Sequence, residues 1–202
     1  IKTPIAALRL LLEEEEPDRA AMEGEIYRIE QYVEFALQYQ RLEGGHKDLV
    51  FAHYSLESIV KKALKKTGVL FRRTKLALEL GNLQTDVLTD EKWLVFVLEQ
   101  VLTNAVKYTR KGKISIYLDP EKEKTLVVED TGMGIRPEDL PRIFEWGYTG
   151  YNGRIKNRAT GIGLALCRQT MEMLGHRISA KSEPGKGICI YLDLAVDPVR
   201  DY

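Results

Sequence analysis

Polar side chains gather on one face of the segment LVFVLEQVLTNAVKYT. Gln100, Asn104, Lys107 and Tyr108 recur at helical spacing beside an apolar stripe, which predicts a helix with one buried and one polar face. An amide oxygen can bind a hydrated magnesium ion, an ammonium group can bind phosphate, and a phenol ring can pack on a base. These residues therefore suit a nucleotide site, although a solvated helix face gives the same pattern.

The segment LVVEDTGMGI joins an apolar strand to a carboxylate and two glycines. Asp130 stands at the end of the predicted strand, and Gly132 and Gly134 follow it. A carboxylate at a strand end can accept a hydrogen bond from an exocyclic amine such as that of adenine. Glycines also let a ligand approach the backbone closely. A plain turn at a sheet edge is the alternative interpretation.

The segment ATGIGLALCRQTMEML places Gly161 and Gly163 in the first turn of a predicted helix. Unpaired amides and the helix dipole form an anion site there. The preceding segment 146–160 is glycine-rich, basic and aperiodic, which predicts a mobile lid whose Arg154 and Lys156 add positive charge. The alternative is a loop whose glycines only permit tight helix packing, and the spacing fits neither a Walker motif nor a dinucleotide fingerprint.

Apolar residues recur at steps of three and four within residues 1–45, which predicts two helices with a narrow apolar seam. Between them, Pro17 ends the first helix and Asp18 caps the second. Such a hairpin buries little surface alone. We therefore expect a second copy of the chain to complete a dimeric four-helix bundle.

Strands and helices alternate after a linker signal at residues 42–45. The predicted strands lie near residues 48–54, 75–80, 84–88, 113–119, 124–130, 177–181 and 187–194. The predicted helices lie near residues 55–68, 90–109 and 161–174. Seven strands on one face and three helices on the other predict a two-layer α/β sandwich, so the fold class of the whole chain is α+β.

Composition narrows the class of protein. The chain has 30 basic and 30 acidic residues and no formal net charge, which argues against a nucleic-acid partner. It contains neither the run of about 18 apolar residues that a membrane helix needs nor a signal peptide. Cys167 and Cys189 lie in apolar segments without CxxC spacing, which predicts buried, reduced thiols. Because the sequence begins at Ile1 with a helical pattern, we expect a soluble piece of a longer protein.

The order of these motifs resembles that of a known family. The motifs occur in this order: Asn104, Asp130 with its glycines, segment 146–160, and the glycine pairs beginning at Gly161 and Gly185. This order resembles that of the N, first G, F and second G boxes of bacterial sensor histidine kinases. IKTPIAAL is similar to the residues that follow the histidine of their H box. Their ATP-binding domain, of the Bergerat or GHKL type, also resembles those of gyrase, heat-shock chaperones and mismatch-repair ATPases.

The resemblance implies two domains and an enzymatic activity. Residues 1–45 would form the dimerisation and histidine phosphotransfer hairpin, truncated before its histidine, and residues 46–202 the catalytic ATP-binding domain. The full-length protein would be an ATP:protein-histidine kinase that uses ATP and Mg²⁺ and passes the phosphoryl group to the aspartate of a response regulator. Thr3 matches the residue used in the phosphatase reaction, and the regulator would dock near it. The alternative is a nucleotide-binding conformational or scaffold module without kinase activity.

The resemblance also assigns roles to single residues. Asn104 would hold magnesium and, with Gln100, belong to the catalytic set, while Lys107 would lie near the phosphates and Tyr108 near the adenine. Asp130 would bind the adenine amine. The other residues predicted to bind the cofactor belong to the adenine pocket, the lid or the triphosphate site. They are Gly132, Gly134, Ile135, Phe144, Arg154, Lys156, Thr160, Gly161, Ile162, Gly163 and Leu164.

The segment IFEWGYTGYNGR indicates a subfamily of these kinases. It resembles the F box of the small intramembrane-sensing kinases of Gram-positive bacteria, which work beside ABC transporters in the response to bacitracin and other antimicrobial peptides. This resemblance implies that the chain is the cytoplasmic part of a homodimeric membrane protein. An ABC transporter would be a further partner through the membrane part.

Three departures from the family pattern bear on function. The phosphoacceptor histidine should lie two residues before Ile1, so this chain alone should not autophosphorylate; His46, His53 and His176 are expected to be structural or exposed.

The other two departures lie near the predicted nucleotide site. Gln100 replaces the glutamate base of the ATP-hydrolysing relatives, which favours phosphoryl transfer over hydrolysis. The neighbouring Glu99 points about 100° away on a helix. Ile188 replaces a small hydroxyl residue, so no hydroxyl contact beside Asp130 is expected there.

Overall fold

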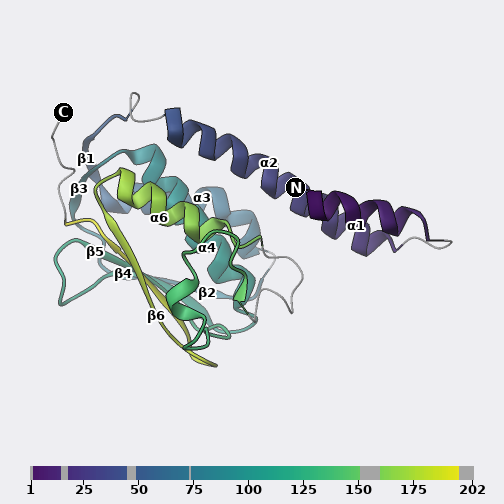
Figure 1. Ribbon diagram of the computed structural model, residues 1–202. Helices are drawn as coiled ribbons and strands as arrows, with labels where there is room; N and C mark the ends of the chain where they lie inside the picture. Colours follow the sequence, from purple (N-terminus) through teal and green to yellow (C-terminus); the bar gives the residue numbers. More distant parts are fainter. Residues whose placement is uncertain (1, 15–17, 45–48, 73, 151–159, 196–202) are drawn as a thin grey trace.

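The computed structural model describes residues 2–14, 18–44, 49–72, 74–150 and 160–195 (Figure 1). A helical hairpin is followed by an α/β domain, so the predicted α+β class is confirmed. The helices are α1 (Lys2–Leu12), α2 (Arg19–Gly44), α3 (Leu56–Arg72), α4 (Glu91–Tyr108), the 3₁₀ helix η2 (Leu140–Arg142) and α6 (Gly163–Met173). The strands are β1 (Ala52–Ser55), β2 (Ala77–Leu80), β3 (Asp86–Thr89), β4 (Lys113–Leu118), β5 (Thr125–Asp130), β6 (Arg177–Glu183) and β7 (Gly187–Asp193).

Helices α1 and α2 lie side by side and project away from the sheet (Figure 1). Asp18 Oδ1 accepts a hydrogen bond from Ala21 N at 3.1 Å, so the predicted cap of α2 is confirmed. Pro17 lies outside the described residues. Among the hairpin side chains that the structure describes, six large apolar ones are more than a third exposed: Ile5, Leu10, Leu12, Ile26, Val33 and Leu37. The apolar seam is thus open in the single chain, and the second copy that would cover it stays a prediction.

The seven predicted strands are present, but they form two sheets instead of one layer. Five of them form a sheet in the order β2-β4-β5-β7-β6, in which β2 and β4 are parallel and the other neighbours antiparallel. Strands β1 and β3 pair only with each other, antiparallel. The reason is local: β1 runs directly into α3 and β3 into α4, so both strands lie at the end of the helical layer.

The core lies between the five-stranded sheet and helices α3, α4 and α6. Alternate residues of the strands point inward, as the period of two requires, and the fully buried ones include Ile114, Ile116, Leu126 and Leu192. The helices meet them with residues at helical spacing, such as Leu94 and Leu98 of α4. The α/β part is therefore the predicted two-layer sandwich, with helices α3, α4 and α6 all on one face of the five-stranded sheet.

Both cysteines are free thiols, as predicted. Cys167 is buried in α6, and burial raises the pKa of its thiol. Cys189 is only half-buried, contrary to the expectation, because it lies on the open face of β7. None of the helices in the described ranges is both long and apolar enough to cross a membrane.

Asp90 connects the start of α4 to the segment that follows the hairpin. Its carboxylate is 6% exposed, and Oδ1 accepts a hydrogen bond from Trp93 N at 3.2 Å in the first turn of α4. The other oxygen, Oδ2, accepts one from Val50 N at 2.9 Å. One side chain therefore caps the helix that carries Gln100 and Asn104 and holds the segment leading into β1.

Replacing Asp90 should test this double contact. Asp90→Ala should lower the free energy of unfolding by about 1–3 kcal/mol, because a helix cap and a buried hydrogen bond to a charged group are lost together. Asp90→Ser should lose less, because serine can cap the helix but is too short for the second bond. Urea unfolding followed by tryptophan fluorescence measures both variants. Asp86→Ala, an exposed aspartate of β3, is the control, and an equal loss in the Asp90→Ala and Asp86→Ala variants would contradict the assignment.

Candidate functional site

Asp130 ends the central strand β5 and faces the interior. It pairs with Ile114 of β4 on one side and Ile188 of β7 on the other, and it is 4% exposed. Its Oδ1 accepts a hydrogen bond from Gly132 N at 2.8 Å. Burial raises the pKa of this carboxyl, while the hydrogen bond from the Gly132 amide opposes the shift.

Gly132 fits a space that no side chain could enter. A Cβ atom there would lie 2.7 Å from Asp130 Oδ1, 2.7 Å from the Tyr108 carbonyl oxygen and 2.8 Å from Thr109 Oγ1. The next residue, Met133, donates its N–H to the same Tyr108 carbonyl at 3.3 Å. The first glycine motif is therefore packed against the C-terminal end of α4, which the sequence separates from it by more than twenty residues.

The turn between β6 and β7 supports the other side of this loop. Gly134 has a positive φ of 66°, and a Cβ atom there would collide with the Glu183 carbonyl group. Ile135 N donates to Ser182 Oγ at 2.8 Å, and Ser182 Oγ donates to the Gly187 carbonyl at 2.7 Å. Sequence reasoning missed Ser182. Its signal was a hydroxyl at an inward position of a strand, where the pattern otherwise favours an apolar residue.

Helix α4 directs its polar residues toward α6. A Cβ atom on Gly163 would lie 3.1 Å from Gln100 Oε1, so Gln100 reaches the first turn of α6. Asn104 lies one turn further along the same helix and is half-buried. Glu99 turns the other way and pairs with Lys66 of α3 at 2.5 Å, as the helical period predicts. Gln100, not Glu99, therefore faces the candidate site.

Lys107 and Tyr108 end α4 as a contacting pair. Lys107 Nζ lies 5.2 Å from the centroid of the Tyr108 ring, within the range of a cation–π contact. Burial raises the pKa of the Tyr108 hydroxyl. The pair adjoins the Asp130 loop, because the Tyr108 carbonyl is the group that receives the Met133 amide.

The second glycine motif leads into α6 and packs closely against another part of the backbone. Gly161 has a positive φ of 69°, and a Cβ atom there would lie 2.6 Å from the Tyr148 carbonyl oxygen. The Gly161 carbonyl also accepts a hydrogen bond from Gly147 N at 3.0 Å. Ile162 is buried, and α6 begins at Gly163. Packing therefore requires glycine at position 161, and the anion role of the start of α6 stays a prediction.

The remaining predicted site residues divide into two groups. Phe144 lies half-buried after η2, and Thr160 and Leu164 flank the glycines at the start of α6. Arg154 and Lys156 lie outside the described residues, as does the side chain of Thr3. Thr3 itself belongs to the first turn of α1 in the projecting hairpin (Figure 1).

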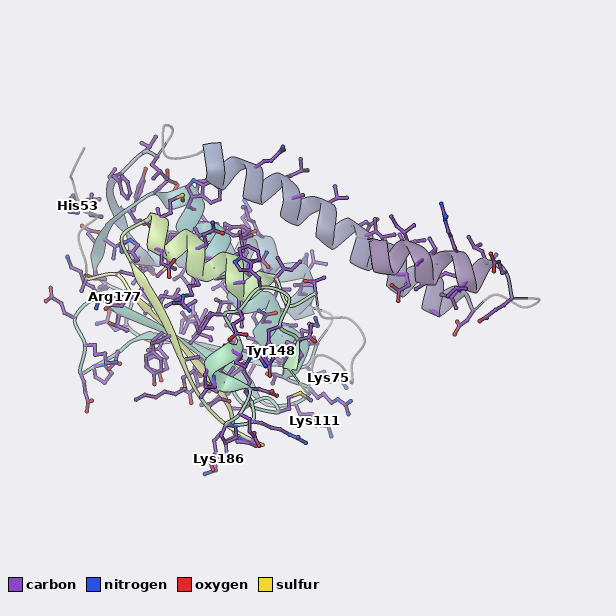
Figure 2. The ribbon with its side chains drawn as sticks, viewed as in Figure 1. His53, Lys75, Lys111, Tyr148, Arg177 and Lys186 are labelled. Carbon is purple, nitrogen blue, oxygen red and sulfur yellow. The ribbon has the colours of Figure 1, made fainter. Side chains whose placement is uncertain are left out.

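The described histidines are structural or exposed, as expected. His53 is exposed in β1, well apart from Tyr148 (Figure 2). His176 is 2% exposed, and its Nε2 lies 3.1 Å from Thr89 Oγ1 in the core. His46 lies outside the described residues.

Removing the Ser182 hydroxyl should loosen the Asp130 loop. Ser182→Ala should lower the free energy of unfolding by about 1–2 kcal/mol, because the Ile135 amide and the Gly187 carbonyl both lose a part-buried partner. Ser179→Ala is the matched control, since Ser179 lies on the open face of the same strand and is exposed. Amide hydrogen exchange should accelerate at Ile135 in the first variant only. Unchanged exchange at Ile135 would show that Ser182 does not hold the loop.

Comparison with known proteins agrees with this geometry. Residues 89–198 match the family described as histidine kinase-, DNA gyrase B- and HSP90-like ATPase. The sensor protein BceS of Halalkalibacterium halodurans is 37% identical over 190 residues, which cover 93% of this chain and 57% of that protein. The sensor histidine kinase GraS of Staphylococcus epidermidis is 33% identical over 195 residues, covering 95% of this chain and 56% of that protein. The chain therefore spans little more than half the length of these relatives.

A solved structure shows the same fold. The Acinetobacter baumannii histidine kinase AdeS superposes with a TM-score of 0.68 at 24% identity, and the match covers 96% of each chain. The region matched by the family contains the buried Asp130, both glycine motifs and most of the sheet around which they are arranged. The chain thus belongs to the family of histidine kinase-, DNA gyrase B- and HSP90-like ATPases.

Proposed function

We propose that this chain is the ATP-binding domain and most of the phosphotransfer hairpin of a bacterial sensor histidine kinase, divided near residues 45 and 46. In the whole protein, a histidine would be phosphorylated by Mg-ATP, and the phosphoryl group would pass to an aspartate of a response regulator. The observation that carries the proposal is the buried Asp130 carboxylate, braced by Gly132 in a loop that leaves no room for side chains. The names of the relatives support the reaction class.

The residues around Asp130 fit an adenine nucleotide. Asp130 would accept a hydrogen bond from the adenine amine at a buried position, where such a bond discriminates strongly. Tyr108 and Ile135 would border the base. Lys107 would lie near the phosphates, and Gly161 with Gly163 would present the first amides of α6 to the triphosphate.

Asn104 would supply the protein's ligand for magnesium. In the described part of the chain, no three His, Cys, Asp or Glu side chains gather as a metal site, so the ion would be held by an amide oxygen and by phosphate oxygens. When bound, magnesium would reduce the charge on the phosphates and so favour attack on the γ-phosphorus.

Gln100 favours phosphoryl transfer over hydrolysis. It reaches the start of α6, where a general base for water would be needed, and an amide cannot take the proton. In the transfer, an imidazole nitrogen would form a bond to the γ-phosphorus while the bond to the β,γ-bridging oxygen breaks. ADP would leave with that electron pair. The family pattern puts this imidazole two residues before Ile1.

The hairpin would provide the contacts with other proteins. Its exposed apolar seam would pack against a second copy, because a solvent-facing stripe of this kind is unfavourable until it is covered. The receiver domain of the response regulator would dock near Thr3, and Thr3 would assist the phosphatase reaction.

The cellular context follows from the relatives and from the segment IFEWGYTGYNGR. We infer that the chain lies on the cytoplasmic side of a bacterial membrane protein, since its relatives are named as a sensor protein and a sensor histidine kinase. An ABC transporter would be a further partner through the membrane part. That inference rests on the likeness of this one segment to intramembrane-sensing kinases.

Phosphorylation of a longer protein tests the proposed reaction. A dimeric protein extended upstream of Ile1 should incorporate acid-labile, base-stable phosphate from labelled ATP at the histidine two residues before Ile1. Asn104→Ala should lower the rate about 100-fold or more, because several kcal/mol of charge stabilisation would be lost with the metal.

Two controls make this result specific. Asn82→Ala removes an amide in an exposed loop, where Asn82 Oδ1 accepts only a local bond from Gln84 N at 3.0 Å, and it should leave the rate unchanged. Replacing the upstream histidine with glutamine should abolish labelling. ATP binding without any phosphorylation of the extended protein would contradict the kinase assignment and point to a scaffold instead.

A further inference from the structure

The side chain of Tyr148 is held by two charged residues. Its hydroxyl donates a hydrogen bond to Asp139 Oδ1, immediately before the 3₁₀ helix η2. The guanidinium carbon of Arg142, at the end of η2, lies 4.2 Å from the centroid of the Tyr148 ring, which is a close cation–π contact. Figure 2 shows Tyr148 beside η2. A half-buried tyrosine outside the glycine motifs is thus fixed at both its hydroxyl and its ring.

The partners of Tyr148 are fixed in turn. Arg142 Nε donates to Glu145 Oε2 at 2.9 Å, and the Glu145 carbonyl accepts a hydrogen bond from Tyr148 N at 3.3 Å. A Cβ atom on Gly150 would lie 3.1 Å from Asp139 Oδ2, so the backbone packs closely on the other carboxylate oxygen. The geometry therefore allows Tyr148 little freedom to move away from η2.

The backbone at Tyr148 also packs directly against Gly161. Gly147 N donates to the Gly161 carbonyl at 3.0 Å. A Cβ atom on Gly161 would lie 2.5 Å from the Gly147 carbonyl carbon and 2.6 Å from the Tyr148 carbonyl oxygen. Gly161 reaches this contact with a positive φ of 69°, two residues before α6 begins at Gly163. Any displacement of residues 147 and 148 would therefore move the approach to α6.

We propose that Tyr148, held by Asp139 and Arg142, is a positioning residue that fixes Gly161 and the first amides of α6 for binding the triphosphate. This inference rests on the proposed function, because it assumes that phosphates bind at the start of α6. It differs in assigning a role to the contact between Tyr148 and Asp139, of which Asp139 lies outside the motifs that the sequence indicates. The adenine end of the site should not depend on this contact, since Asp130 accepts its hydrogen bond from Gly132 and the loop after it is held by Ser182 through Ile135 N.

Removing the Tyr148 hydroxyl tests the phosphate end of the nucleotide site separately from the adenine end. Tyr148→Phe should weaken Mg-ATP binding about tenfold, the effect expected when one hydrogen bond to a charged acceptor is lost. Binding of adenosine, which has no phosphates, should stay unchanged. Calorimetry measures ATP binding to this chain, and an NMR titration measures adenosine binding.

Matched variants separate positioning from a general loss of structure. Tyr117→Phe deletes the same oxygen, whose hydrogen bond to Glu129 Oε2 at 2.9 Å lies on the open face of the sheet, and it should bind ATP normally. Asp139→Asn keeps an acceptor for the Tyr148 hydroxyl and should retain most of the affinity. Asp139→Ala should reproduce the loss of the Tyr148→Phe variant.

Two outcomes would overturn the inference. If the wild type binds Mg-ATP and Tyr148→Phe binds it equally well, the contact has no role in holding the triphosphate. If ATP and adenosine weaken together, the contact supports the fold in general and not the start of α6. An absence of ATP binding in the wild type is a different result, because it would refute the proposed function on which the inference rests.

Discussion

A carboxylate withdrawn from water at the end of the central strand is the constraint on which the rest of the α/β domain depends. Burial of Asp130 is unfavourable unless a donor faces it, and the Gly132 amide supplies one at 2.8 Å. Gly132 also lies against the Tyr108 carbonyl at the end of α4, and Gly187 at the start of β7 lies against the Asp130 carbonyl. The loop after β5, the end of α4 and the start of β7 must therefore stay in register, because no side chain fits at Gly132. The cost of burial is understandable if the carboxylate recognises a ligand.

The helices extend this constraint to the phosphate end of the candidate site. Helix α4 joins Asp90, which caps it and holds the chain arriving from the hairpin, to Tyr108, whose carbonyl closes the Asp130 loop. Gln100 connects α4 to the start of α6. A displacement of α4 would therefore shift both glycine motifs and the segment that leads to the hairpin.

The sequence predicted the elements better than the contacts between them. Helix α4 was expected at residues 90–109 and spans Glu91–Tyr108, because an apolar period of 3.6 residues and the Asp90 cap are local signals. The separate β1–β3 pair was not expected, since period-two patterning does not state which strands become neighbours. The role of Ser182 and the Tyr148–Asp139 contact were missed for the same reason: they depend on segments brought together only by the fold. Residues 151–159, which include Arg154 and Lys156, lie outside the described part.

The central claim is that the Asp130 carboxylate recognises adenine, and calorimetric titration of Mg-ATP into wild-type and Asp130→Asn protein tests it most directly. The wild type should bind, and the variant should bind about 100-fold more weakly, because an amide oriented by the Gly132 N–H turns its NH₂ donor toward the base. Burial raises the pKa of Asp130, so wild-type affinity should fall on acidification at a higher pH than an ordinary aspartate would cause. Equal affinity of the two proteins, or no binding by the wild type, would contradict the account.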